Sequence, residues 1–509
     1  MDVTQILMLI TILVYLVAMV GIGAVLAKQN QTTDDFYLGG RTLGPLVTAM
    51  SAEASDMSSW LLMGLPGVAY LSGTADAAWT AIGLAIGTYV NWLVVAKRLR
   101  NYTHVCGNST TLPLFFSNRY RDNKRILSVI AALLIIIFFV PYTASGFAAC
   151  GKLFANLFGM DYLPAMLISA IVIVAYTTLG GFLAASTTDF VQSIVMTIAI
   201  VVVFGFGISK VGSFSAVMDN AKSMAGYFSL THTHDVATGT ASPYSLLQIF
   251  STLAWGLGYF GMPHVLLRFM AIGDANKLKL SRRVATVWVV ISMAVSVFIG
   301  VIGNAMTKAG VLPTLKDPET IILVVADLIS KHGVLATIIA GLILAGILAA
   351  TMSTADSQLL AASSSASQNI LKEVFMKDMS EKTGMLIARI TVLVIALIGV
   401  FIARNPDSSV FQIVSFAWAG FGASFGPLVL LALFWKRSTF QGALCGMVSG
   451  GVMVFVWKFL IRPMGGALGI YELLPAFLLG LAVNVIVSLL TPAPSREVQD
   501  EFDKVASMK

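Results

Sequence analysis

The sequence predicts an all-α protein that crosses a membrane many times, and three observations predict it. Hydrophobic residues make up 57% of the 509 residues and charged residues only 11%, against about 25% charged residues in soluble domains. The mean hydropathy of +0.86 is too high for a protein whose whole surface meets water, which excludes a disordered chain and an ordinary soluble enzyme. The apolar residues also form long runs, whereas a membrane β-barrel would show alternation.

The long apolar runs predict the number of crossings. A helix needs about 20 apolar residues to span the hydrocarbon core, and marking such runs predicts thirteen crossings in a single transmembrane domain over residues 1–509. They lie at 5–27, 43–71, 76–97, 126–150, 162–180, 187–209, 243–270, 284–307, 333–366, 386–404, 408–435, 440–462 and 470–491. The runs 43–71 and 333–366 exceed one straight crossing, as expected for a tilted, interrupted or extended helix.

The basic residues predict the orientation. Most of the 32 Lys and Arg residues fall in loops on the C-terminal side of the membrane, including the group from Arg268 to Arg283. Because cytoplasmic loops carry the excess of Lys and Arg, we expect the N-terminus outside and the C-terminus in the cytoplasm. The net charge of +7 is explained by these flanking residues, so it does not indicate nucleic-acid binding.

The second run, SAEASDMSSWLLMGLPG, carries six polar side chains in nine residues. A charge at the bilayer centre costs about 2.5–3.5 kcal/mol on insertion scales, so such residues favour a function. The pattern predicts a helix interrupted where it lines a cavity. The alternative is that these carboxylates lie near the inner interface and reach water. It applies to Glu53 more than to Asp56.

The seventh run, STLAWGLGYFGMPHVLLRFMA, has a matching irregularity. Three glycines and Pro263 disrupt the helix among Trp255, Tyr259 and Phe260, so backbone carbonyls are freed beside aromatic walls. The alternative is an aromatic helix interface with ordinary membrane glycines. Tyr142, which follows Pro141 in the fourth run, begins a weaker polar patch.

The ninth run ends in LAGILAATMSTADSQLL, which places hydroxyl groups before Asp356. Backbone carbonyls and hydroxyls are suitable ligands for a small hard cation. The alternative is that Thr351, Ser353 and Thr354 bond back to carbonyls of their own helix.

Two irregular runs roughly 200 residues apart indicate an inverted-repeat secondary transporter. The first repeat would be helices 2–6, about 43–209, and the second helices 7–11, about 243–435, with helices 1, 12 and 13 peripheral. Each repeat would have five helices. Because five is an odd number, the two repeats would start on opposite sides of the membrane, as an inverted repeat requires.

Enzyme and sensor functions are disfavoured. No nucleotide-binding, zinc-protease or serine-hydrolase motif is found, the five histidines are scattered, and the three cysteines form no metal or disulfide pattern. The tail after Leu490 is too short for a fused signalling domain.

The chain resembles the sodium/solute symporter family over nearly its whole length. The resemblance rests on DFYLGGRTLGP, SAEASDMSSWLLMGLPG, WGLGYFGMPH, LAGILAATMSTADSQLL and FWKRSTFQGALCGM, in this order. It implies thirteen helices with a leucine-transporter-like core, helices 2 and 7 being broken. It also implies a bacterial cell membrane protein that is not an enzyme, takes up a small solute with co-transported sodium by alternating access, and needs no obligate protein partner.

The resemblance also implies site residues. It assigns sodium to Ala54, Met57, Ala350, Ser353 and Thr354, with Asp56 and Ser58 nearby. It assigns the solute to Ser59, Tyr142, Trp255, Tyr259 and Pro263, and coupling or gating to Arg41 and Asp189.

Within the family, the motifs are most similar to those of bacterial members that carry proline, so we expect L-proline as the solute. Three positions depart from that pattern: glycine is expected where Glu53 and Ser59 stand, and glutamine where Met262 stands. Ser59 would narrow the solute pocket, and Glu53 adds an acid near the ion path. The alternatives are pantothenate, a short carboxylate, a sugar or another amino acid.

Overall fold

A computed structural model describes residues 2–29, 31–376, 378–405 and 409–508. Ten helices of this described part are long and apolar enough to cross a membrane. They are Val3–Gln29, Thr74–Val105, Ile126–Phe158, Tyr162–Val211, Ala275–Lys308, Val334–Phe375, Glu381–Ile402, Val410–Phe434, Phe440–Met464 and Leu473–Leu490. The expectation of a helical, polytopic membrane protein is therefore confirmed. The predicted start of the eleventh run, residue 408, lies outside the described residues.

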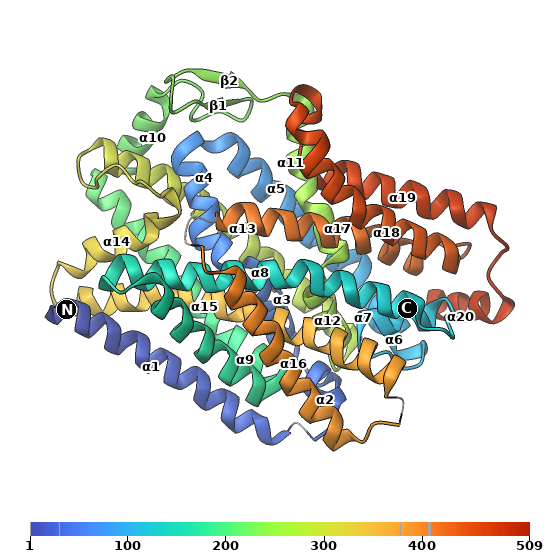
Figure 1. Ribbon diagram of the computed structural model, residues 1–509. Helices are drawn as coiled ribbons and strands as arrows, with labels where there is room; N and C mark the ends of the chain where they lie inside the picture. Colours follow the sequence, from blue (N-terminus) through green and yellow to red (C-terminus); the bar gives the residue numbers. More distant parts are fainter. Residues whose placement is uncertain (1, 30, 377, 406–408, 509) are drawn as a thin grey trace.

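The bundle is built from these elements (Figure 1). Its first half contains α1 (Val3–Leu26), α2 (Thr33–Leu38), α3 (Pro45–Ser59), α4 (Leu65–Ser72), α5 (Thr74–Val90), α6 (Ala96–Val105), α7 (Leu112–Arg119), α8 (Ile126–Phe158), α9 (Tyr162–Val211) and α10 (Phe214–Ser223). Its second half contains α11 (Leu246–Leu253), α12 (Pro263–Ala271), α13 (Leu278–Lys308), α14 (Ile321–Ser330), α15 (Val334–Ser364), α16 (Glu381–Ile402), α17 (Val410–Phe434), α18 (Phe440–Val456), α19 (Leu473–Leu490) and α20 (Arg496–Ser507).

Helix α9 is two helical segments joined at one residue. It runs for 50 residues, far more than one crossing needs. Gly181 has φ 60° and ψ −161°, which is outside helical geometry and which glycine adopts without steric cost. The bend falls between the predicted runs 162–180 and 187–209.

Helix α3 is interrupted at Ser58. This residue has φ 46° and ψ −173°, and a π-helical turn, Trp60–Gly64, leads into α4. The Ser58 hydroxyl accepts the Trp60 backbone N–H at 3.0 Å. The same N–H also donates to the Met57 and Ser58 carbonyls, so the side chain adds an acceptor in the distorted turn.

The seventh predicted run is irregular in the same way. A 3-10 segment, Ala254–Gly261, follows α11, and Met262 is extended before α12 begins at Pro263. Glycine is required for packing as well, because a Cβ at Gly256 would collide with the backbone of Gly83, and one at Gly258 with the Trp418 indole. This segment therefore lies directly against α5 and α17.

Helix α15 lies at the centre of the bundle. It packs against α1, α3, α8 and α9, and α3 packs in turn against α9, α12 and α13. Two segments far apart in the sequence, the break in α3 and the middle of α15, are thereby placed side by side.

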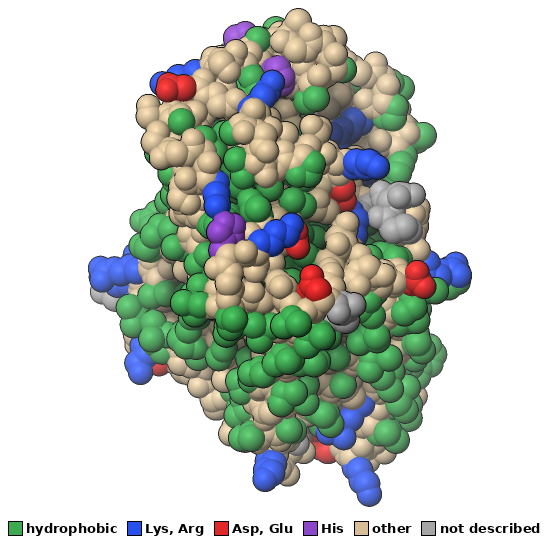
Figure 2. All heavy atoms as spheres, turned by 90° about the vertical axis from the view of Figure 1, so that its left-hand side faces the viewer, with side chains coloured by type: hydrophobic (Ala, Val, Ile, Leu, Met, Phe, Trp, Pro, Cys, Tyr) green, Lys and Arg blue, Asp and Glu red, His purple; other side chains and the backbone are tan. Residues whose placement is uncertain are grey.

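One end of the bundle carries shorter elements, namely α10, α14 and a small antiparallel hairpin, β1 (His232–His234) with β2 (Ala241–Pro243). The all-α prediction did not include these strands. The two termini lie at opposite ends of the bundle (Figure 1). In Figure 2, hydrophobic side chains cover most of the lower half of the visible face, interrupted by isolated charged groups.

Candidate ion and solute sites

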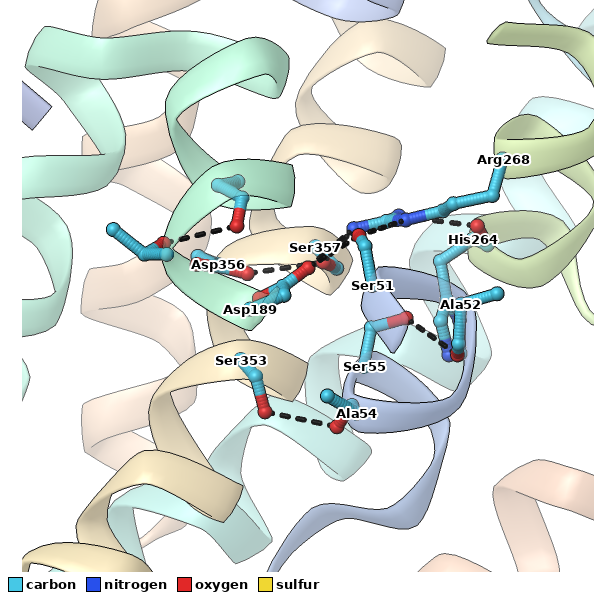
Figure 3. Close-up of polar contacts among 12 residues, drawn as sticks. Ser51, Ala52, Ala54, Ser55, Asp189, His264, Arg268, Ser353, Asp356 and Ser357 are labelled. Atoms are coloured by element: carbon cyan, nitrogen blue, oxygen red, sulfur yellow. Dashed lines mark hydrogen bonds and ion pairs between the residues drawn. The ribbon is translucent and has the colours of Figure 1, made fainter. Parts of the chain in front are cut away.

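A cluster of neutral oxygens joins α15 to the interrupted helix α3. The Ser353 hydroxyl donates to the Ala54 carbonyl at 2.8 Å and is also 3.2 Å from the Ala350 carbonyl. The Thr354 hydroxyl donates to the same Ala350 carbonyl at 3.2 Å. Figure 3 shows Ser353 of α15 pointing at Ala54 across the helix interface. The structure therefore brings together four of the five residues expected to bind sodium.

The other expected members lie one turn further along α3. The Met57 carbonyl accepts the Trp60 N–H in the distorted turn. Asp56 is buried, and one of its carboxylate oxygens, Oδ2, accepts the Tyr259 hydroxyl at 2.5 Å, while Oδ1 has no hydrogen-bond partner among the described residues. The donor set of carbonyls, hydroxyls and a nearby carboxylate suits a small hard cation.

Only some of the three hydroxyl groups of α15 bond exclusively to carbonyls of their own helix, which was the alternative interpretation. Thr351 donates to the Ile347 carbonyl at 3.0 Å and Thr354 to the Ala350 carbonyl, both within α15. Ser353 differs because its hydroxyl also reaches α3.

Aromatic side chains surround a small cavity next to Asp56. It is lined by Asp56, Met57, Trp60, Leu84, Tyr142, Trp255, Val414 and Trp418. Its volume is only about 10 Å³, which is room for about one water molecule. An amino acid could enter only after a movement of these side chains, so the protein is closed around this cavity.

Trp255 is the centre of the aromatic cluster. Its ring lies 5.6 Å from that of Trp60 and is stacked on Tyr471 at 5.0 Å, both measured between ring centroids. The Trp418 indole N–H donates to the Trp255 carbonyl at 2.7 Å. The Tyr259 ring meets Trp418 edge-on at 5.0 Å.

The expected solute residues divide into two groups. Tyr142 and Trp255 line the cavity, Tyr259 binds Asp56, and the Tyr142 hydroxyl lies 3.4 Å from the Asp56 carbonyl oxygen. Ser59 and Pro263 are buried but do not line the cavity; Pro263 is the first residue of α12, where its missing N–H costs nothing.

Glu53 does not reach water. Its side chain is 1% exposed, and its Oε1 accepts the Trp92 indole N–H at 2.7 Å. The alternative of carboxylates that reach water at the inner interface is therefore wrong for Glu53, and Asp56 is buried as well. The reason is that Trp92, from the π-helical turn Asn91–Val95 after α5, reaches the Glu53 carboxylate, which a sequence read one helix at a time cannot show.

A second polar cluster, centred on Arg268, lies close to the first (Figure 3). Arg268 forms an ion pair with Asp189 at 3.1 Å, both side chains being fully buried. Its guanidinium also donates to Ser51 at 3.0 Å and to Ser357 at 2.6 Å. The assignment of Arg268 to the inner water-facing group is therefore wrong: its charge is neutralised within the bundle.

The same cluster contains a second carboxylate. Ser357 donates to Asp356 at 3.0 Å, and the Tyr176 hydroxyl donates to the other oxygen of Asp356 at 2.6 Å. Ser51 donates to Asp189 at 2.6 Å. Helices α3, α9, α12 and α15 thus meet in one buried network, and it contains the predicted coupling residue Asp189.

Arg41, the other residue expected in coupling, lies elsewhere. Its guanidinium donates to the Met270 carbonyl at 2.6 Å and to the Ser109 carbonyl at 2.8 Å, which links the segment before α3 to α12 and to the loop before α7. The structure does not bring Arg41 to Asp189.

Several residues of these sites were not predicted, and Trp60, Trp418 and Arg268 are the most prominent of them. Trp60 lies within the polar motif itself, and Trp418 lies in a glycine-rich stretch of the eleventh run, so both carried a signal. Arg268 carried none, because a basic residue at the end of an apolar run is typical of an interface residue.

No group of three His, Cys, Asp or Glu side chains in the described part of the chain could hold a metal ion. The three cysteines are free.

Comparisons with known proteins agree on one family of membrane transporters. The sequence model described as the sodium:solute symporter family matches residues 36–450. The sodium/proline symporter of Escherichia coli K12 is 41% identical over 500 residues, covering 97% of this chain and 95% of that one. The osmoregulated proline transporter of Bacillus subtilis is 40% identical over 489 residues, covering 96% of each chain.

Two solved structures share the fold. A Na⁺-coupled sialic acid symporter in a substrate-bound, outward-open state matches 96% of this chain and 99% of its own, with a TM-score of 0.79 at 18% identity. Mhp1, a transporter of the nucleobase-cation-symport-1 family, in a closed conformation, matches 92% of this chain and 98% of its own with a TM-score of 0.55 at 14% identity.

Proposed function

Because this chain belongs to the sodium:solute symporter family, we propose that it imports L-proline together with sodium across a bacterial cell membrane. The sodium/proline symporter of Escherichia coli and the osmoregulated proline transporter of Bacillus subtilis support proline, since each is matched over at least 95% of its own length. The same kinship supports a transporter rather than an enzyme.

One observation carries the proposal. The Ser353 hydroxyl reaches the Ala54 carbonyl beside the interruption of α3, and Asp56, two residues later, faces Tyr259 and the aromatic cavity. An ion held by the first group and a solute held in the second would therefore share one interrupted helix. Binding of either would change the position of that helix and so affect the other.

In this proposal, sodium binds to the oxygens of Ala54, Met57, Ala350, Ser353 and Thr354, with Asp56 and Ser58 nearby. The solute binds beside Tyr142, Trp255 and Tyr259, and the closed aromatic cavity opens to admit it. Ser59 and Pro263 support the backbone of this pocket. Asp189 acts in coupling through its pair with Arg268, and Arg41 through its contacts with α12.

The proposed topology has thirteen crossings. The ten long helices become thirteen when α9 counts twice and the segments α3–α4 and α11–α12 count once each. The halves would be helices 2–6 and 7–11, with an external N-terminus and a cytoplasmic C-terminus. The termini at opposite ends of the bundle support an odd number of crossings, and the excess of Lys and Arg in the loops on the C-terminal side supports the direction. A cysteine-accessibility map of the two termini in intact cells tests it.

The test of the function is uptake of labelled proline into proteoliposomes. One sodium ion moving down about 100 mV supplies about 2.3 kcal/mol, and a tenfold gradient adds about 1.4 kcal/mol. For one sodium per proline, we expect accumulation of up to about 500-fold. A sodium ionophore should abolish it, and uptake that ignores both sodium and voltage would contradict symport.

Competition by unlabelled compounds in the same uptake assay distinguishes proline from the alternative solutes. Unlabelled pantothenate, a short carboxylate, a sugar and other amino acids, each in excess, should leave labelled proline uptake nearly unchanged. If one of them suppresses uptake and is itself accumulated with sodium, that compound is the solute and proline is not.

Asp56→Asn should raise the sodium concentration needed for half-maximal uptake by about tenfold. By Coulomb's law, a unit charge at a separation on the order of 10 Å contributes about 1.7 kcal/mol at an effective dielectric constant of 20, and each 1.4 kcal/mol is tenfold. Glu53→Gln should do much less, because the amide oxygen can still accept the Trp92 N–H. A wild-type sodium response in Asp56→Asn, with transport lost in Glu53→Gln, would show that the ion depends on Glu53 instead.

A further inference from the structure

A groove with apolar walls lies between α9 and α13 and reaches α3. It has a volume of about 500 Å³ and is lined by Met50, Thr197, Ile200, Val201, Arg283, Val284, Val287, Trp288, Ile291 and Ser292. The lining positions recur every three or four residues along both long helices, so each helix presents one continuous face to the groove. From Arg283 to Ser292 the groove extends about 13 Å along α13.

The walls of the groove are apolar. Its few uncharged polar side chains, Thr197, Trp288 and Ser292, already form hydrogen bonds within the protein. The Thr197 hydroxyl donates to the Ser193 carbonyl at 2.7 Å and accepts the Trp288 indole N–H at 2.8 Å. Ser292 donates to the Val289 carbonyl at 3.2 Å. The mouth of the groove carries Val201, Val287 and Ile291, each more than half exposed. These side chains face hydrocarbon in a protein that spans the membrane.

Arg283 is the one charged group of the groove. It is exposed and makes no hydrogen bond or ion pair with any residue that the structure describes. It stands at the end of α13 that follows the basic segment Lys277, Lys279 and Arg282. A fixed cation at one end of an apolar groove complements a molecule with one anionic end and a hydrocarbon chain.

We propose that this groove binds an anionic phospholipid, with one acyl chain between α9 and α13 and the phosphate at Arg283. The bilayer supplies such a molecule, and basic pockets between membrane helices at the cytoplasmic side are suited to anionic headgroups. Met50 lies one helical turn before Ala54, so the acyl chain touches the inner part of the helix that carries the proposed sodium ligands. The bound lipid thereby packs against a helix that moves during transport.

Trp288 provides a direct readout, because bromine atoms on acyl chains quench tryptophan fluorescence only at short range. The full-length protein is placed in phosphatidylcholine nanodiscs with increasing fractions of acyl-brominated phosphatidylglycerol, or of brominated phosphatidylcholine. The difference between the wild type and Trp288→Phe isolates the Trp288 signal. We expect half-maximal quenching at about a fivefold lower fraction of the anionic lipid.

Two variants and one control test the two ends of the site. Arg283→Gln should remove the preference for phosphatidylglycerol, and Val287→Phe, which fills the mouth, should reduce quenching by both lipids. Arg282→Gln is the matched control, because its guanidinium lies over the Tyr89 ring at 5.6 Å and not in the groove. Equal quenching by both lipids in the wild type, or equal shifts in Arg282→Gln and Arg283→Gln, would overturn the proposal. Neither outcome depends on which solute is carried.

Discussion

Replacement of Arg268 with glutamine is expected to lower the free energy of unfolding by about 3–5 kcal/mol, the usual effect of removing one partner of a buried ion pair. Arg268 and Asp189 are 3.1 Å apart with side chains only 1% and 0% exposed. Without the guanidinium, the Asp189 carboxylate would be left in the bundle without its cation, while Ser51 and Ser357 would lose a donor. Thermal unfolding of the purified protein in detergent measures the loss.

A surface ion pair is the control for this prediction. Arg121 pairs with Glu497 at 3.0 Å and Glu501 at 2.7 Å, but its side chain is 39% exposed. Because exposed pairs contribute about 0–1 kcal/mol, Arg121→Gln should be nearly as stable as the wild type.

The double variant Arg268→Met with Asp189→Leu distinguishes charge burial from lost packing. It removes both charges and keeps similar volumes, so it should recover most of the stability lost in Arg268→Gln. If Arg268→Gln unfolds at the wild-type temperature, the pair does not stabilise the fold, and its proposed part in coupling loses its structural basis.

The second large effect is expected at the ion site. Ser353→Ala and Thr354→Ala should each weaken the sodium response by about 5- to 150-fold, because loss of a neutral oxygen from a cation site costs about 1–3 kcal/mol. Ser353 should be the more sensitive position, since its hydroxyl donates across the helix interface to Ala54 of α3, whereas the Thr354 hydroxyl donates within α15. Sodium dependence of uptake at saturating proline measures both.

The choice of saturating conditions is essential, because linkage transmits any loss at one site to the apparent affinity of the other. At saturating sodium, both hydroxyl variants should bind proline nearly normally, whereas Tyr259→Ala should not. Thr351→Val is the matched control, since Thr351 is buried in the same helix and its hydroxyl donates to the Ile347 carbonyl of that helix rather than to α3. Loss of proline binding by Ser353→Ala at saturating sodium would contradict separate ion and solute sites.

The local character of membrane helices explains how much could be predicted. A helix satisfies its backbone hydrogen bonds within itself, so the apolar runs predict where the helices lie. The same holds for the interruptions, because Ser58, the glycines of Ala254–Gly261 and Pro263 act on the backbone beside them. The helical membrane fold, and the likeness that led to the symporter family, were therefore available from the sequence by itself.

Partnerships between helices were decided only in the tertiary structure. Arg268 and Asp189 are 79 residues apart, and Glu53 and Trp92 are 39 apart on different helices. Nothing in the local pattern distinguishes a basic residue that reaches water from one that is neutralised inside the bundle. Whether a charge at the end of an apolar run is exposed or paired depends on which other helix packs against it. That packing arises from side chains distant in the sequence, and it alone placed Ser353 against Ala54 and closed the aromatic side chains around Asp56.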